Sequence, residues 1–190
     1  MALIPTKDRY GAVAIFLHWS MAIIIIAMFF LGEYMVELNY AHPWYHRAPH
    51  LHESFGLILF ALLLIRTVWT ATTTKPEPVP MPVWEQRAAS IVKRLFYLLL
   101  FGIAISGYLI PTADGKSIAL FNWFEVPAII SGIEHQEDIA GEVHSVVTHI
   151  IMALVALHIL AALKHHFIDR DSTLLRMLGI KPNNSRKEKV

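Results

Sequence analysis

The chain has 190 residues, of which 55% are hydrophobic and 16% charged, and its formal net charge at pH 7 is +1. Its mean hydropathy is +0.49. The sequence contains no cysteine, which excludes disulfide bonds, a haem attached through a C-x-x-C-H motif and iron–sulfur clusters held by thiolates. We expect no nucleic-acid partner.

Four apolar stretches dominate the chain, at about residues 12–33, 51–71, 90–111 and 139–163. Each is long enough to span a bilayer, which takes about 20 mainly apolar residues. Residues 1–190 are therefore predicted to form one all-α membrane domain, a four-transmembrane-helix bundle surrounded by membrane lipid. Lys7 and Arg9 precede the first stretch as in a signal peptide. That stretch is too long for one and lacks a small-residue cleavage site, so we expect a retained helix.

The connections have their own signals. Four prolines lie between Lys75 and Pro82, which predicts an extended turn. The long connection from Pro111 to about Asp138 carries Trp123 and Phe124, which suit the membrane interface. Residues 180–190 are polar and are predicted to be a disordered tail.

The basic residues set the expected orientation. Fourteen of them lie in or near the two tails and the connection between the second and third stretches, whereas Arg47 and Lys116 lie on the opposite side. Because cytoplasmic segments carry an excess of lysine and arginine, both termini are predicted to be cytoplasmic.

Four histidines lie within or at the ends of these apolar stretches: His18, His52, His144 and His158. An ionisable side chain in hydrocarbon is a candidate functional residue. His144 and His158 are 14 residues apart, so on one helix they share a face, within about 40°, and differ by about 21 Å in depth. Depth then pairs His18 with His158 and His52 with His144. Two buried metal centres, each held by two imidazoles, fit this arrangement, and two bis-histidine b haems fit it best. Iron held by two imidazole nitrogens in this way has no open coordination position, so it passes electrons and does not bind oxygen.

The 14-residue step also reaches other residues. From His52 it leads to Arg66, level with the inner pair, where a guanidinium is predicted to bind a haem propionate. From His18 it leads to Gly32, level with the outer pair, where a missing side chain leaves room for a macrocycle. The third stretch offers small residues that would let it pack closely against a porphyrin or against a neighbouring helix, namely Gly102, Ser106 and Gly107.

Two simpler interpretations compete with these. Any one membrane histidine could merely hydrogen-bond between helices, although four at matched depths favour metal centres. The outer segment with His42, His46, His50 and His52 could hold zinc or copper, because imidazole suits both ions. Its i, i+4 spacing needs a helix, and Pro43 and Pro49 argue against a continuous one. Solvated histidines around a haem edge are therefore expected there.

The chain resembles the prokaryotic cytochrome b561 family, which is related to the cytochrome b subunits of nickel hydrogenases. The resemblance spans nearly the whole chain, through RYGAVAIFLHW, APHLHESFG, GYLIPTADGK and ALHILAALKHHFIDRDSTLLRM. It implies a multi-pass protein of the bacterial inner membrane with two b haems. Carried over by position, it implies His18, His52, His144 and His158 as axial ligands. It also implies electron exchange with ubiquinone, and one branch of the family resembles a superoxide oxidase.

Three functions follow as hypotheses. The first is electron transfer between the ubiquinone pool and a small periplasmic one-electron donor, with superoxide as the leading candidate, which would make the chain an oxidoreductase. The second is an electron-transfer subunit for a periplasmic redox protein. The third is a non-redox metal transport module.

The outer charges separate the first two hypotheses. Nine acidic residues are expected on the outer side against Arg47 and Lys116. A positive face would steer superoxide, whereas an acidic face suits a basic protein partner.

Overall fold

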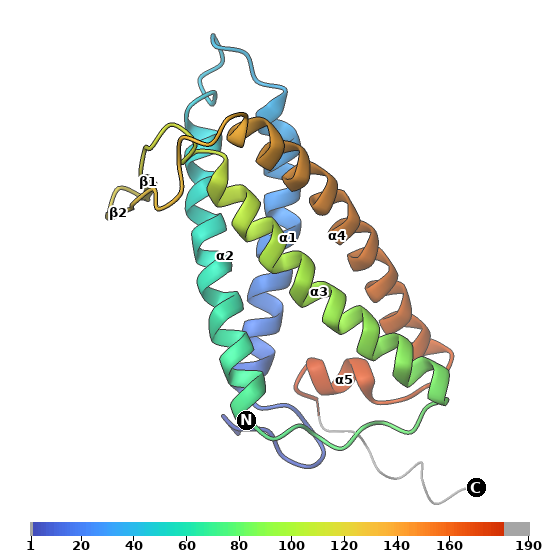
Figure 1. The fold of residues 1–190 in the computed structure, drawn as a ribbon. Helices are drawn as coiled ribbons and strands as arrows, with labels where there is room; N and C mark the ends of the chain where they lie inside the picture. Colours follow the sequence, from blue (N-terminus) through green and yellow to red (C-terminus); the bar gives the residue numbers. More distant parts are fainter. Residues whose placement is uncertain (1, 181–190) are drawn as a thin grey trace, which may run out of the picture.

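The computed structural model describes residues 2–180 and is dominated by four long helices (Figure 1). They are α1 (Ala12–Val36), α2 (Arg47–Thr72), α3 (Val83–Leu109) and α4 (Gln136–Phe167). Two short strands, β1 (Ile118–Leu120) and β2 (Phe124–Val126), and a short helix, α5 (Thr173–Met177), complete the described part. Residues 181–190 of the predicted disordered tail lie outside the described residues.

The four long helices have the length and hydropathy of membrane spans. They contain 25, 26, 27 and 32 residues, with mean window hydropathies between 1.8 and 2.4. At about 1.5 Å per residue the shortest is about 38 Å long, which exceeds the hydrocarbon thickness of about 30 Å. The predicted four-span helical membrane bundle therefore agrees with the observed fold.

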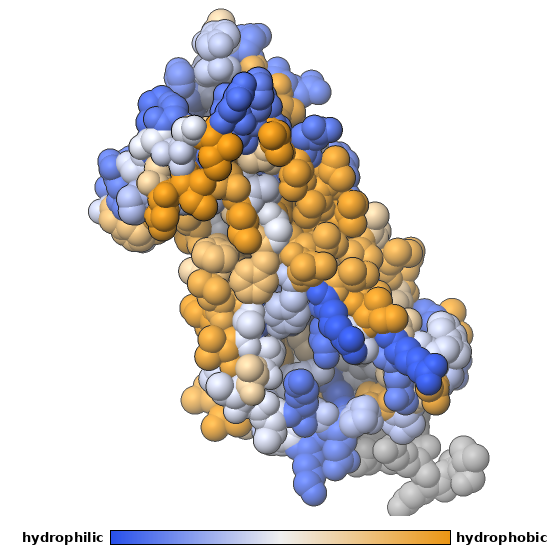
Figure 2. Space-filling view, in the orientation of Figure 1, coloured by the Kyte–Doolittle hydropathy of each residue, from blue (hydrophilic) through white to orange (hydrophobic). Residues whose placement is uncertain are grey.

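The surface has the polarity expected of such a bundle. Figure 2 shows that hydrophobic residues prevail over the middle of the face in view and that hydrophilic residues gather toward both ends. Large hydrophobic side chains point outward from the helices, among them Phe16, Phe30, Ile105 and Leu160, which are 56–65% exposed. A soluble surface rarely carries so large a contiguous apolar area, so this apolar region is the lipid-facing surface.

The helices extend beyond the apolar stretches that predict them. The second begins at Arg47, ahead of residue 51, and the third begins at Val83, ahead of residue 90. Pro49 is the third residue of α2, where a backbone N–H has no acceptor in the helix, so proline does not disturb it. Pro82 precedes α3 and ends the predicted extended turn.

A small core joins the helices at mid-depth. Met21, Leu63, Leu100 and Ile151, one from each long helix, are at most 8% exposed and pack together. Ile151 is seven residues from both His144 and His158, which is about 10.5 Å along α4 in each direction. The core therefore fills the space midway between the two histidine levels.

The outer connection forms a two-stranded hairpin that is fastened to α2. β1 and β2 pair antiparallel, with Ala119 opposite Glu125. The fully buried Ser54 of α2 donates to the Ala119 carbonyl at 3.2 Å and accepts from the Phe121 N–H at 3.1 Å. These two bonds hold the hairpin beside the outer end of the bundle.

Candidate functional site: two histidine pairs between the helices

The structure brings the four intramembrane histidines together as two pairs. His52 of α2 and His144 of α4 form the outer pair, with ring centroids 6.1 Å apart. His18 of α1 and His158 of α4 form the inner pair, with centroids 6.2 Å apart. In both pairs the ring planes are inclined at 70°. These are the partners that depth along the helices predicts.

The ring separation matches one metal ion between two imidazoles. A metal–imidazole bond is about 2.0 Å long, and the ring centroid lies about 1.1 Å beyond the nitrogen, so two opposed ligands place their centroids about 6.2 Å apart. The observed separations of 6.1 and 6.2 Å have this value at both levels. Each pair therefore has the ring separation expected of two imidazoles that bind one ion.

The ring of His144 is oriented by the third helix. Its Nδ1 lies 3.1 Å from the Ile103 carbonyl and 3.2 Å from the Ser106 hydroxyl. Because the Ile103 carbonyl can only accept, Nδ1 carries the proton and Nε2 keeps its lone pair. Such a contact is the usual outer-shell support of a metal-binding histidine. The sequence singled out Ser106 as a small residue and did not indicate this contact.

Two glycines allow close approach to the outer pair. A Cβ on Gly107 of α3 would lie 2.8 Å from Cε1 of His144, and a Cβ on Gly32 of α1 would lie 3.3 Å from Cε1 of His52. The Nδ1 of His52 is buried and has no hydrogen-bond partner among residues 2–180. The outer imidazoles thus occupy space that only glycine leaves free, and one of them keeps an unpaired polar atom.

The inner pair lies beside Arg66. A guanidinium nitrogen of Arg66 is 3.5 Å from Nδ1 of His18, at the outer limit of a hydrogen bond. Trp19 stands edge-on to His18 with centroids 5.3 Å apart, and Phe96 stands edge-on to His158 at 5.8 Å. Arg66 is therefore at the level of the inner pair, as the sequence predicts, and its contact there is weak enough to leave it free for an anion.

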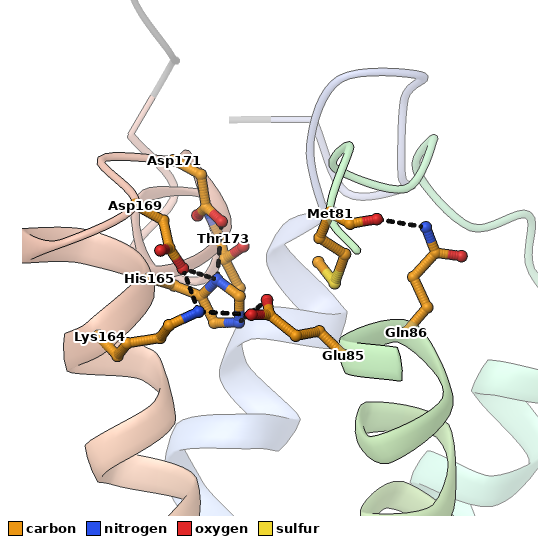
Figure 3. A network of polar contacts seen from close by, with 8 residues as sticks. All are labelled: Met81, Glu85, Gln86, Lys164, His165, Asp169, Asp171 and Thr173. Atoms are coloured by element: carbon orange, nitrogen blue, oxygen red, sulfur yellow. Dashed lines mark hydrogen bonds and ion pairs between the residues drawn. The ribbon is translucent and has the colours of Figure 1, made fainter. Parts of the chain in front are cut away.

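A polar network closes the N-terminal end of α3 against the end of α4 (Figure 3). Lys164 lies 2.6 Å from Glu85 and 2.9 Å from Asp169, while Nδ1 of His165 lies 2.9 Å from Asp171 and 3.0 Å from Asp169. Although Glu85, His165 and Asp169 bring metal-ligand atoms close together, the Lys164 ammonium already forms ion pairs with Glu85 and Asp169. The network therefore fastens α3, α4 and the segment before α5 to one another.

A family model described as prokaryotic cytochrome b561 matches residues 9–179. The chain belongs to the prokaryotic cytochrome b561 family. The predicted resemblance is thus confirmed, and with it a prokaryotic membrane cytochrome that carries haem b and transfers electrons.

Curated relatives cover nearly the full chain. Cytochrome b561 homolog 2 of Escherichia coli is 47% identical over 180 residues, which is 94% of this chain and 96% of the relative. Cytochrome b561 homolog 1 of the same organism is 26% identical over 172 residues, covering 90% and 97%. A Yersinia pestis protein named "Probable superoxide oxidase CybB" is 27% identical over 180 residues, covering 90% and 96%.

The residues at both levels suit a b-type haem. The donor set is two imidazoles per level, and the chain has no cysteine for covalent attachment, which is the ligation of a non-covalent haem between histidines. Gly32 and Gly107 leave space beside His52 and His144, where a flat cofactor and its ligands would need room. The Nδ1 of His52, which has no hydrogen-bond partner among the described residues, lies at the same level. The four histidines therefore fit the cofactor that the cytochrome b561 family implies.

Proposed function

We propose that the chain binds two b haems, one between His18 and His158 and one between His52 and His144. We further propose that it moves electrons between the ubiquinone pool and a one-electron donor or acceptor outside the bacterial inner membrane, with superoxide as the leading small molecule. The observation that carries the proposal is the repeated imidazole separation, 6.2 Å at one level and 6.1 Å at the other.

Each residue then has a simple task. When bound, haem supplies a one-electron couple whose potential follows burial, hydrogen bonding and charge around it. The four imidazoles would supply the nitrogen ligands of the two haems, two at each level. The Ile103 carbonyl fixes the tautomer of His144 through Nδ1. Arg66 is proposed to bind a propionate of the inner haem through charge-assisted hydrogen bonds.

The two levels are connected through an apolar core. His144 and His158 are 14 residues apart on α4, which is about 21 Å along the helix. Met21, Leu63, Leu100 and Ile151 fill the interval. These four side chains are at most 8% exposed, so the interval between the two proposed haem levels is apolar at its centre.

Charge distribution supports placing the inner pair toward the cytoplasm. Fourteen of the 16 lysines and arginines lie in the two tails, in the connection between α2 and α3 or in the parts of the helices at that same end of the bundle, whereas the connection between α3 and α4 is acidic. Under the positive-inside rule both termini face the cytoplasm. The outer pair of His52 and His144 then faces the periplasm.

Superoxide is supported by the name of the Yersinia pestis relative, at 27% identity. The outer charges favour a different donor. Lys116 pairs with Asp114, and the hydrogen bond with Asp114 raises the pKa of Lys116 while the same contact lowers the pKa of Asp114. Both groups are therefore charged at neutral pH, and the positive charge that could attract an anion is already balanced.

A periplasmic redox protein is the second candidate, because the acidic outer side complements a basic partner. The metal-transport hypothesis has no support from the comparisons, since the family is one of electron-transfer proteins.

The first experiment counts haem. A pyridine haemochrome assay on the purified protein should give two b haems per chain. Each of His18→Ala and His158→Ala should remove one haem, and each of His52→Ala and His144→Ala should remove the other. His149→Ala is the matched control, because this α4 histidine lies outside both pairs and contacts Ser145 and Glu33.

The second experiment identifies the donor. In stopped-flow experiments, superoxide should reduce the haems of the wild-type protein faster than the haem of the His52→Ala variant. Subsequent reduction of ubiquinone would complete the support for superoxide as the donor. Reduction by superoxide no faster than that of free haem would refute it and leave the protein partner. A colourless wild-type protein would refute the haem assignment itself.

A further inference from the structure

The outer end of α2 carries a second set of metal-ligand residues, His46, His50 and Glu53, spaced i, i+4 and i+7. His46 is the residue before α2 and has helical backbone angles, φ −94° and ψ −27°. The His50 N–H donates to the His46 carbonyl at 3.5 Å. Because the helical path is continuous through Pro49, the three side chains share one face, within about 60° of one another.

This continuity removes the objection that the sequence raised. Pro43 and Pro49 were expected to prevent a helix across the histidine-dense outer segment. Pro43 does lie before the helix, but Pro49 falls in its first turn, where its missing N–H costs nothing. The i, i+4 histidine pair therefore exists as a structural unit.

The three side chains line one cavity. Its volume is about 550 Å³, and it is also lined by Met35 and Val36 at the end of α1 and by Leu38 just after the helix. The Nε2 of His50 is buried and has no hydrogen-bond partner among the described residues. A buried imidazole nitrogen without a partner is unfavourable, and a turn of the His50 ring toward the cavity would let a bound ion become its partner.

We propose that His46, His50 and Glu53 bind one divalent transition-metal ion, Zn²⁺ or Cu²⁺, at the outer end of α2. Imidazole nitrogen and carboxylate oxygen are ligands that both ions accept. The ligand atoms of the three residues do not all lie within 4.8 Å of one another in the structure, so binding requires the side chains to turn toward a common centre in the cavity. Three protein ligands leave a further position for water or a small anion, as in open zinc sites.

The site is distinct from the outer histidine pair. His50 and His52 are two residues apart, so their side chains leave α2 about 160° apart, on nearly opposite faces of the helix. His52 is directed toward His144 in the bundle, whereas His50 lines the cavity against the end of α1. Metal binding at this site does not depend on the proposed haem ligation.

An ion here would change the local charge of the outer side. The described outer segments are mostly acidic, and Lys116 is paired with Asp114. A dication held by one carboxylate leaves a net positive charge beside Glu53. It would therefore supply locally the positive charge that the protein side chains do not.

The test uses the full chain, purified with haem and with an affinity tag that contains no histidine. After equilibrium dialysis against Zn²⁺, elemental analysis should find one zinc per chain above the haem iron. His46→Ala, His50→Ala and Glu53→Gln should each weaken zinc affinity by more than the roughly 10–100-fold that loss of an outer-shell partner costs. His135→Ala should leave it unchanged, because His135 is an exposed residue beside α4 that does not line the cavity.

Zinc uptake that is absent from the wild type, or that falls equally in His135→Ala and His50→Ala, would overturn the proposal. Electron paramagnetic resonance of the Cu²⁺-loaded protein gives a second readout. Its copper signal should show coupling to two nitrogens in the wild type and to one in His50→Ala, and a signal without nitrogen coupling would also overturn it. Haem counted in the same samples reports folding. A colourless protein that still binds zinc would refute the proposed function and leave this inference standing.

Discussion

Replacing Gly107 by alanine tests the role of the outer pair without touching a ligand. The new Cβ would lie 2.8 Å from Cε1 and 3.1 Å from Nδ1 of His144. Ordinary contacts begin at 3.4 Å, so the imidazole must move by about 0.6 Å or the helices must separate. Movement away from α3 stretches the 3.1 Å contact between Nδ1 and the Ile103 carbonyl to about 3.7 Å, beyond a hydrogen bond.

The expected size of the effect follows from this contact. Losing an outer-shell partner of a metal-binding histidine lowers metal affinity about 10–100-fold, which is about 1.4–2.7 kcal/mol. Alanine also favours helix over glycine by about 1 kcal/mol, which stabilises the fold and does not act on the ligand. Gly107→Ala should therefore be a well-folded protein that holds its outer haem weakly.

Gly102→Ala is the matched control. It lies on the same helix, and its Cβ would meet no described atom within 4 Å, so it gains the same helix propensity without the displacement. Gly32→Ala should fall between the two, because its Cβ would lie 3.3 Å from His52.

The assay is the haemochrome count after purification, followed by haem titration of the depleted protein. Gly107→Ala should keep the inner haem and lose most of the outer one, while Gly102→Ala keeps two. Two tightly bound haems with unchanged potentials in Gly107→Ala would refute the proposed role of His144.

Three further predictions concern the fold. Ser54→Ala leaves the Phe121 N–H and the Ala119 carbonyl without their partner. The free energy of unfolding, measured by chemical denaturation, should fall by about 1–3 kcal/mol, and an unchanged midpoint would contradict this. Glu85→Gln removes the charge that binds Lys164 at 2.6 Å. Since Lys164 is 38% exposed, we expect a loss of only about 1 kcal/mol, with faster proteolysis after α4. An alkaline phosphatase fused to the C-terminus should be inactive in cells and a fluorescent protein fused there should be bright, since the tail is predicted to be cytoplasmic; the reverse would overturn the orientation.

Hydropathy predicts the helices but underestimates their ends. α3 starts at Val83 and includes Glu85, Arg87 and Lys93. Helical turns that lie outside the hydrocarbon core tolerate charged side chains, and their backbone hydrogen bonds continue the helix. Hydropathy indicates only the part of a helix that lies in the hydrocarbon core, whereas backbone hydrogen bonds determine where the helix begins and ends. For the same reason α2 begins four residues before the predicted stretch.

The histidine pairs are predictable because a helix converts residue number into depth. The 14-residue step also places Gly32 beside His52 correctly. In contrast, nothing in the sequence indicates that the Ile103 carbonyl orients His144, since a backbone acceptor has no residue signature. The Ser54 tether and the β1–β2 hairpin depend on tertiary contact and are likewise not predicted.

The long helices pack as two hairpins, α1 against α2 and α3 against α4, with little direct packing of α1 on α4. Each histidine pair takes one member from each hairpin, His18 and His52 from the first and His158 and His144 from the second. On the proposed ligation, each iron would thus cross-link the two helical hairpins. Cofactor supply would then decide whether newly inserted chains close into a protease-resistant bundle.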